Sequence, residues 1–200
     1  MSKFLDLNGL DYFAKTYVKP SLTRYVNGFD KNLYNYGLSQ FKVLNSTNYT
    51  WSDNIATHTG GIIFEINTDG TITVTVPNNY SYSSACIFNL SESYATEFAG
   101  KTYAYSGCPT GGDYTNGYSM YIADSNSNTT AKDEGTGVIS TFPSPSYRLR
   151  ICFRNTSASG TYIFKPMICT VDDWNVSHDY VPYKNGIATN DEILTMFESI

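Results

Sequence analysis

The chain has 200 residues, of which 41% are apolar, so it is long enough to bury one substantial hydrophobic core. Charged residues make up only 16% of the chain, whereas 18 tyrosines help to raise the aromatic share to 16%. Low charge with many aromatic side chains is typical of strands and polar loops and excludes a disordered chain. The formal net charge of −5 argues against nucleic acids and anionic membranes as partners.

The first segment, residues 1–28, has the spacing of a helix. Asn8 can cap its start, and Leu10, Phe13 and Tyr17 fall on one face. The segment lacks the apolar run of a signal peptide, and no later stretch is apolar enough to span a membrane. We therefore expect a protein that is made in the cytoplasm and that uses this apolar face for packing.

The apolar period changes to two after residues 29–60, which we assign to a linker of uncertain structure. Between residues 62 and 76, Ile and Val alternate with polar residues on both sides of Asp69-Gly70, which predicts a β-hairpin. Short strands separated by Gly, Pro, Asn and Asp follow, without a helical pattern between them. Residues 61–184 are thus predicted to form an antiparallel β-sandwich of the jelly-roll type. The other predicted strands are Phe41–Leu44, Ala85–Leu90, Thr102–Ser106, Tyr118–Ala123, Gly137–Thr141, Tyr147–Arg154 and Thr161–Cys169.

The C-terminal segment, residues 185–200, returns to helical spacing. Thr189 and Glu192 form a capping box, and Ile193 and Phe197 belong to an apolar stripe. A helix of about ten residues is not stable alone in water, so it must pack on another surface. The predicted fold class is all-β, with short helices at both ends.

The four cysteines are widely spaced and form no zinc-binding motif. Most of them lie in or beside apolar strand-like segments, so we predict buried free thiols, with a disulfide as the less favoured alternative. The four residues are Cys86, Cys108, Cys152 and Cys169.

No motif for catalysis, for a cofactor or for a metal ion occurs in the sequence, so we expect a protein without enzymatic activity. His58 is expected in a loop, and Asp172-Asp173 in a turn or at the start of a short helix before Trp174. The segment 124–128 imitates the start of a calcium loop but lacks its glycine and its closing glutamate. A polar surface loop is the favoured interpretation, and calcium bound by a loop stays an alternative.

Arg148, Arg150 and Arg154 fall on one face of a predicted strand, opposite an apolar face. The favoured interpretation is an outer face that its charge keeps solvated. The alternative is a ladder that binds an anionic polymer.

Two loops, residues 77–83 and 109–117, combine tyrosine rings with amide, hydroxyl and carboxylate groups. Sugars offer apolar C–H faces and many hydroxyls, so such combinations suit carbohydrate binding. Ordinary turn chemistry is the alternative, because Gly, Pro, Asn and Asp also favour turns. The predicted ligand contacts are Tyr80, Tyr82, Asp113, Tyr114 and Asn116.

Residues 4–13 (FLDLNGLDYF) resemble an N-terminal segment of virion appendage proteins from phages and prophages of Gram-positive bacteria. Residues 100–112 (GKTYAYSGCPTGG), together with 164–168 (FKPMI) and 180–183 (YVPY), resemble a domain of the same proteins. That domain is the β-sandwich of tail-fibre, baseplate-associated and head-fibre proteins, and it is similar in shape to carbohydrate-binding modules. The resemblance implies no catalytic residues.

The resemblance implies a virion structural protein of the tail-fibre or receptor-binding type, made in the host cytoplasm, that attaches to a host-surface glycan. We expect a homotrimer whose helix docks on other virion proteins through Leu10, Phe13 and Tyr17. No cofactor, nucleic acid or membrane is expected as a partner. The alternatives are a head fibre or capsid decoration protein without an essential ligand, and a free carbohydrate-binding module.

Overall fold

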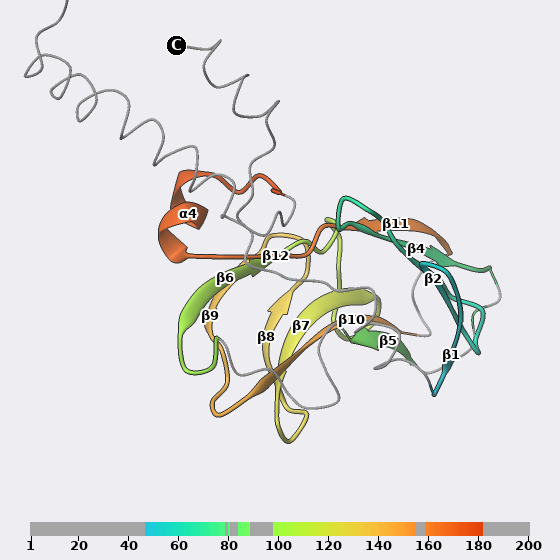
Figure 1. Cartoon of the computed structure of the whole chain (residues 1–200), viewed down its shortest axis with the longest axis horizontal. Coiled ribbons are helices and arrows are strands. Elements are labelled where there is room, and N and C mark those ends of the chain that lie inside the picture. The colour runs from blue at the N-terminus through green and yellow to red at the C-terminus, as the bar shows by residue number, and fades with distance from the viewer. Residues whose placement is uncertain (1–46, 79, 81–83, 89–97, 155–158, 182–200) are drawn as a thin grey trace, which may run out of the picture.

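The computed structural model of the chain describes residues 47–78, 80, 84–88, 98–154 and 159–181 (Figure 1). The two predicted terminal helices, 1–28 and 185–200, lie outside these residues, and so does the predicted strand Phe41–Leu44. The proposed docking residues Leu10, Phe13 and Tyr17 lie outside them as well.

Twelve strands and one short helix make up the described residues, and every strand pair is antiparallel. The predicted all-β class is therefore confirmed. One sheet has the order β1 (Tyr49–Ser52), β2 (Ile55–His58), β3 (Ile63–Ile66), β4 (Ile72–Val76) and β11 (Gly160–Phe164). A second has the order β5 (Ser84–Phe88), β10 (Tyr147–Arg154), β7 (Tyr118–Asp124) and β8 (Thr129–Asp133). A third has the order β12 (Met167–Cys169), β6 (Thr102–Ser106) and β9 (Val138–Thr141), with helix α4 (Val171–Val176) following β12.

The predicted hairpin is formed by β3 and β4, in which Phe64 pairs with Val74 and Ile66 with Ile72. Alternate residues of β4 are buried, as a strand with one face on a core requires. In the turn, Asp69 Oδ1 accepts hydrogen bonds from the backbone N–H and the hydroxyl of Thr71 at 2.9 and 2.7 Å. These bonds lower the pKa of the Asp69 carboxyl.

Strand β10 shows the same alternation in the four-stranded sheet. Tyr147, Leu149, Ile151 and Phe153 are at most 3% exposed, whereas the three arginines of the strand are half-buried on the opposite face. The predicted division of this strand into an apolar inner face and a basic outer face is confirmed.

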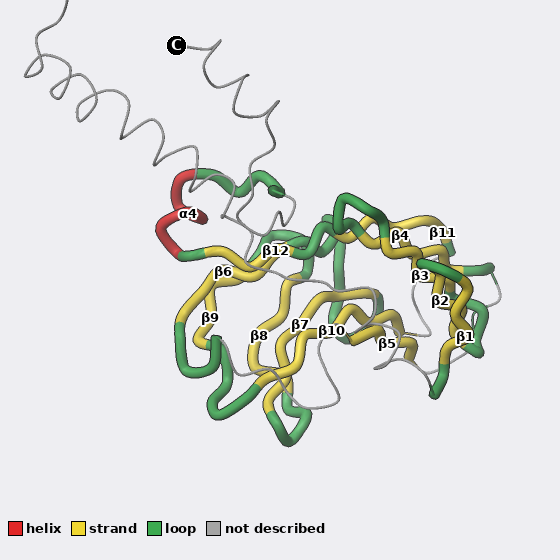
Figure 2. Tube along the Cα trace, in the orientation of Figure 1, coloured by secondary structure: helices red, strands yellow, loops and turns green. Residues whose placement is uncertain are grey.

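Side chains from all three sheets meet in one hydrophobic core. Phe64 of the five-stranded sheet lies 6.1 Å from Phe153 of the four-stranded sheet, measured between ring centres. Tyr105 of β6 and Ile168 of β12 belong to the same cluster of buried residues. In Figure 1 the five-stranded sheet lies at one side of the described residues, and β6, β9, β12 and α4 lie at the other. Figure 2 shows how loops connect the short strands between them.

Several elements differ from the prediction. Strands β1 and β2 occupy residues 49–58, inside the range 29–60 that we assigned to a linker. Strand β8 occupies part of a segment expected to be polar loop, because only one of its residues, Ala131, is aliphatic. The predicted strand Thr161–Cys169 is divided between β11 and β12, which belong to different sheets.

His58 ends strand β2 and is 4% exposed, so its predicted place in a loop was wrong. Its Nδ1 accepts a hydrogen bond of 3.0 Å from the backbone N–H of Gly60, and its ring lies 5.0 Å from that of Tyr49. Burial disfavours the charged imidazolium and lowers the pKa of His58.

The prediction of four free thiols was wrong for two of them. Cys86 of β5 and Cys152 of β10 are directly opposed in the sheet, with Cα atoms 4.1 Å apart, and they form a disulfide. Cys108 and Cys169 are buried free thiols, as predicted. The pair was missed because 66 residues separate the two cysteines, so only the strand register brings them together.

Candidate binding groove and surrounding loops

An open groove of about 640 Å³ lies between α4 and the ends of strands β6, β8 and β11. Its volume is in the range of small-molecule binding sites. Four separate segments of the chain contribute to it. The lining residues are Ser106, Gly107, Cys108, Pro109, Thr110, Gly135, Thr136, Gly137, Ile163, Lys165, Trp174, His178, Asp179 and Tyr180.

Helix α4 places the aromatic part of the groove. Thr170 caps the helix by accepting a hydrogen bond of 3.1 Å from the backbone N–H of Asp173. The predicted helix start at Asp172-Asp173 is found, with both residues in the first turn and Trp174 inside the helix. Trp174 is 8% exposed and its indole packs beside Gly137. The ring of His178 stacks on this indole, with the centres 4.0 Å apart and the planes 13° from parallel. Since His178 is exposed, a stacked aromatic pair borders the groove.

Gly137 is required beside Trp174 for two reasons. Its φ is +73°, which favours glycine, and a Cβ at this position would lie 2.5 Å from the indole. The close approach of the β8–β9 loop to α4 therefore depends on the absence of a side chain.

A buried carboxylate holds the two backbone loops of the groove. Asp133, at the end of β8, is 0% exposed. Its Oδ2 accepts the N–H of Cys108 at 2.8 Å, and its Oδ1 accepts the N–H groups of Gly135 and Gly137 at 2.9 and 2.8 Å. Because all three donor residues line the groove, Asp133 fixes the wall without being part of its surface.

The polar groups of the groove are suited to hydrogen bonding rather than to nucleophilic chemistry. Lys165 and Asp179 are exposed, and the Tyr180 hydroxyl donates a hydrogen bond of 2.9 Å to the carbonyl of Asp69. Burial raises the pKa of the Cys108 thiol, with the nearby Asp133 as the second cause, so this sulfur stays protonated. Among the residues that the structure describes, no group of three His, Cys, Asp or Glu side chains could hold a metal ion.

The predicted contacts of loop 109–117 do not line the groove, whose lining includes only the start of that loop, Pro109 and Thr110. Asp113 Oδ1 accepts the N–H groups of Thr115 and Asn116 at 2.7 and 2.9 Å, and these bonds lower the pKa of its carboxyl. Asn116 also donates to Asp113 Oδ2 at 3.3 Å. Both residues therefore form a turn, while their contact with a ligand stays a prediction.

The three predicted tyrosine contacts are not brought together in one described site. Tyr114 is half-buried and its hydroxyl shares a hydrogen bond of 2.7 Å with that of Thr129. Tyr80 is 8% exposed and belongs to the hydrophobic core, where its ring contributes to packing. Tyr82 lies outside the described residues. The structure therefore does not bring the two predicted tyrosine loops together in one described site.

The segment that imitates a calcium loop forms a turn between β7 and β8. Asp124 Oδ1 accepts the N–H groups of Asn126 and Asn128 at 2.9 and 2.8 Å. The side-chain amide of Asn128 donates to Asp124 Oδ2 at 3.0 Å and, with these backbone bonds, lowers the pKa of Asp124.

Sequence reasoning missed the groove as a site. Trp174 and His178 have a spacing of four residues, but His178 lies beyond the end of α4, so the helical period gave no reason to pair them. The one signal was the glycine-rich segment 100–112, five residues of which border the groove.

In sequence, no protein-family model and no curated protein matches the chain. Three solved structures are similar to part of the backbone of this chain, at low TM-scores. One is a glycosylation-associated protein (Gap123) complex from Streptococcus agalactiae, with 11% identity over 60% of this chain and 43% of that chain, at a TM-score of 0.36. Another is the enzymatically active domain of tailspike protein 4 of bacteriophage CBA120, with 14% identity, 72% and 22% coverage and a TM-score of 0.37.

The third is an arabinose-bound MgGH51 α-L-arabinofuranosidase, with 10% identity, 86% and 29% coverage and a TM-score of 0.33. The chain spans less than half the length of each of these structures. At these TM-scores none of them defines the fold or the function of this chain. Within the described residues, no helix has the length and the hydrophobicity of a membrane span.

Proposed function

We propose that the protein is a non-enzymatic structural component of a phage virion that binds a host-surface glycan in the groove beside α4. The groove carries this proposal, because it combines a stacked aromatic pair, His178 on Trp174, with polar groups around an open space of about 640 Å³. A sugar ring offers a C–H face to such a surface and hydroxyls to the groups around it.

Each feature of the groove has a part in this binding. The exposed imidazole of His178 offers apolar contact area, and the indole beneath it fixes its position. Lys165 and Asp179 can donate to and accept from sugar hydroxyls. The hydrogen bonds of Asp133 preorganise the backbone that lines the groove, which reduces the conformational entropy lost on binding.

The place in a virion rests on the resemblance of residues 4–13 and 100–112 to phage appendage proteins. The disulfide fits this location, because such bonds persist in oxidising surroundings outside the cell. We further propose that the three sheets form the predicted jelly-roll-like sandwich and that the helix of residues 1–28 docks it on other virion proteins. A homotrimer would display several weak sites together and gain avidity.

The test is binding of the purified protein to host cell-wall polysaccharide, with His178→Ala as the variant. We expect a loss of affinity of roughly tenfold, the effect of about 1.4 kcal/mol of lost contact. Val176→Ala is the matched control, because Val176 ends α4 two residues before His178, is 76% exposed and does not line the groove. Equal binding by wild type and His178→Ala would remove the groove as the site. Absence of binding by the wild type would favour a head fibre or capsid decoration protein.

A further inference from the structure

The end of strand β11 brings an exposed aliphatic side chain into the lining of the groove. Ile163 is 52% exposed and lines the groove, whereas its neighbours Tyr162 and Phe164 pack into the core. Lys165 follows the strand, is exposed and lines the groove as well. An apolar surface and a hydrogen-bond donor therefore come from the same short segment, and the apolar surface gains free energy when a ligand covers it.

The β8–β9 loop offers a hydrogen-bond acceptor to the same groove. The N–H of Gly137 donates to the buried Asp133 at 2.8 Å, and in a trans peptide the carbonyl oxygen points opposite to the N–H. The carbonyl of Thr136, which belongs to the same peptide group, is therefore directed away from Asp133. Thr136 is exposed and lines the groove, and no donor among the described residues binds its carbonyl.

The carboxylate of Asp133 links this acceptor to the segment that carries the donor. Cys108 donates its N–H to Asp133 at 2.8 Å, and the Gly107 carbonyl of the same peptide group accepts the backbone N–H of Lys165 at 2.8 Å. The backbone at Thr136 and the backbone at Lys165 are thus held in one hydrogen-bonded framework. Both groups are positioned before a ligand binds.

An acetamido group matches these three features. It carries an N–H donor, a carbonyl acceptor and a methyl group in one rigid planar unit. The carbonyl of Thr136 can accept from its N–H, the ammonium of Lys165 can donate to its oxygen, and Ile163 can cover its methyl group. A sugar hydroxyl has no methyl group for Ile163, and a carboxylate has no donor for the carbonyl of Thr136.

We propose that the groove selects an N-acetylated sugar, whose acetamido group contacts Ile163, Lys165 and the carbonyl of Thr136. This inference rests on the proposed function, because it specifies which class of glycan the same groove binds. The ring of His178 then contacts the C–H face of the sugar, which every hexose offers. The acetamido group decides between the N-acetylated sugar and its parent hexose, because the hexose leaves these contacts unmade.

NMR titration with free methyl glycosides measures this selection without any contribution from avidity. The glycosides of N-acetylglucosamine, N-acetylgalactosamine and N-acetylmannosamine are each compared with the parent hexose and with the N-formyl derivative, which keeps the amide and lacks only the methyl group. We expect at least one N-acetyl sugar to bind about tenfold more tightly than its parent hexose and about fourfold more tightly than its N-formyl derivative. Equal binding of N-acetyl sugar and parent hexose in all three pairs would overturn the proposal.

Ile163→Ala tests the contact with the methyl group. Its preference for N-acetyl over N-formyl should fall from about fourfold to less than about twofold, since each change removes one side of the same contact. Ile63→Ala is the matched control, because Ile63 is 37% exposed in the same sheet and does not line the groove. An unchanged preference in Ile163→Ala would overturn the proposed contact.

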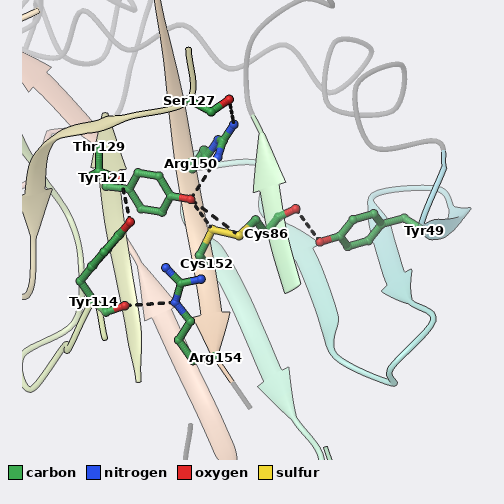
Figure 3. Close-up of a disulfide and its surroundings, with 9 residues drawn as sticks. All are labelled: Tyr49, Cys86, Tyr114, Tyr121, Ser127, Thr129, Arg150, Cys152 and Arg154. Carbon is green, nitrogen blue, oxygen red and sulfur yellow. Dashed lines mark hydrogen bonds between the residues drawn. A yellow bond between two sulfur atoms is a disulfide. The ribbon is translucent and has the colours of Figure 1, made fainter. Parts of the chain in front are cut away.

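Loop 109–117 is the alternative site for such a sugar. Tyr114 of this loop does not line the groove, and Figure 3 shows it near Tyr121 and the disulfide, with its hydroxyl bonded to that of Thr129. Tyr114→Ala should leave the preference for the N-acetyl sugar unchanged. Loss of this preference in Tyr114→Ala, together with a normal preference in Ile163→Ala, would place the acetamido group in the loop and overturn the proposal.

Failure of this proposal and failure of the proposed function give different results. If His178→Ala weakens binding of the glycosides and no N-acetyl sugar is preferred, the groove binds glycans and only the selection is wrong. The same conclusion follows if the wild type binds none of the glycosides but binds host cell-wall polysaccharide through His178. If it binds neither the glycosides nor the polysaccharide, both proposals are overturned.

Discussion

The five-stranded sheet and the groove region are stabilised by different means. In the sheet, alternate side chains such as Phe64 and Val74 are fully buried, so the hydrophobic effect acts over its central strands β2, β3 and β4. Around the groove, the backbone is held by a few polar atoms, above all the carboxylate of Asp133, and by a close approach at Gly137. Stability is therefore distributed over many residues in the sheet, whereas the shape of the groove depends on single residues.

The largest effect is expected from the sheet. Phe64 is 0% exposed and its ring lies near those of Tyr49 and Phe153. Phe64→Ala should lower the free energy of unfolding by about 4 kcal/mol, through lost burial and a cavity. Urea unfolding measures this loss, and at low denaturant the folded fraction should still bind ligand in the groove. A loss below about 1 kcal/mol would show that the sheet is not held by this core.

The disulfide comes next and tests the four-stranded sheet between the two regions. Replacing both Cys86 and Cys152 by Ala should destabilise the protein by roughly 4 kcal/mol, since the bond closes a loop with a separation of 66 residues. Thiol titration of the denatured wild type checks the bond itself. We expect two reactive thiols without reductant and four after reduction, and four in both conditions would show that the bond is absent.

Asp133→Asn should affect the groove region and leave the five-stranded sheet unchanged. The amide that replaces one carboxylate oxygen points a donor at a backbone N–H, so at least one buried N–H loses its acceptor. We expect a loss of about 2–3 kcal/mol together with loss of binding in the groove. Hydrogen exchange should show faster exchange at Cys108 and Gly137 and unchanged protection in β3 and β4. Equal protection at all these positions would contradict the local role of Asp133.

The smallest effect is a pH dependence that originates in the sheet. Because burial lowers the pKa of His58 below its ordinary value of 6.5, the unfolded chain binds a proton more readily than the folded chain below that pH. Stability should therefore fall as the pH decreases from about 7 to 5. The turns at Asp113 and Asp124, whose carboxyl pKa values are lowered, should lose stability only below about pH 4.

His58→Asn is the matched variant, because its side-chain oxygen can accept the hydrogen bond from Gly60 without titrating. Thermal unfolding between pH 5 and 8 should show a flatter profile for this variant. Identical profiles for both proteins would assign the pH dependence to another group.

The two regions also differ in how far the sequence predicts them. The hairpin β3–β4 and strand β10 follow from alternation, since each segment carries its own pattern of buried and exposed residues. Strand β8 was not predicted, because its buried residues are only Ala131 and Asp133. The burial of Asp133 depends on a donor from a distant loop, at Cys108, and on two donors from the loop that follows β8.

The groove could not be predicted from local patterns either, because its residues are distant in sequence. Gly137, Lys165 and Trp174 come from separate segments and meet only when the sheets are assembled. The disulfide likewise depends on the register of β5 against β10. Asp113 and Asn116, which we predicted as ligand contacts, form a turn, because a composition that suits sugars also suits turns. Their contact with a ligand stays a prediction.

Tryptophan fluorescence offers the most direct test of glycan binding in the groove. The chain has two tryptophans, and Trp51→Phe leaves Trp174 as the single indole reporter. This replacement removes a buried indole N–H that has no hydrogen-bond partner, so it should cost little stability. Titration with host cell-wall polysaccharide should then change the emission of Trp174 in a saturable way, and His178→Ala should shift the midpoint about tenfold. Binding to the polysaccharide without any change in Trp174 emission would contradict the account and place the glycan elsewhere on the protein.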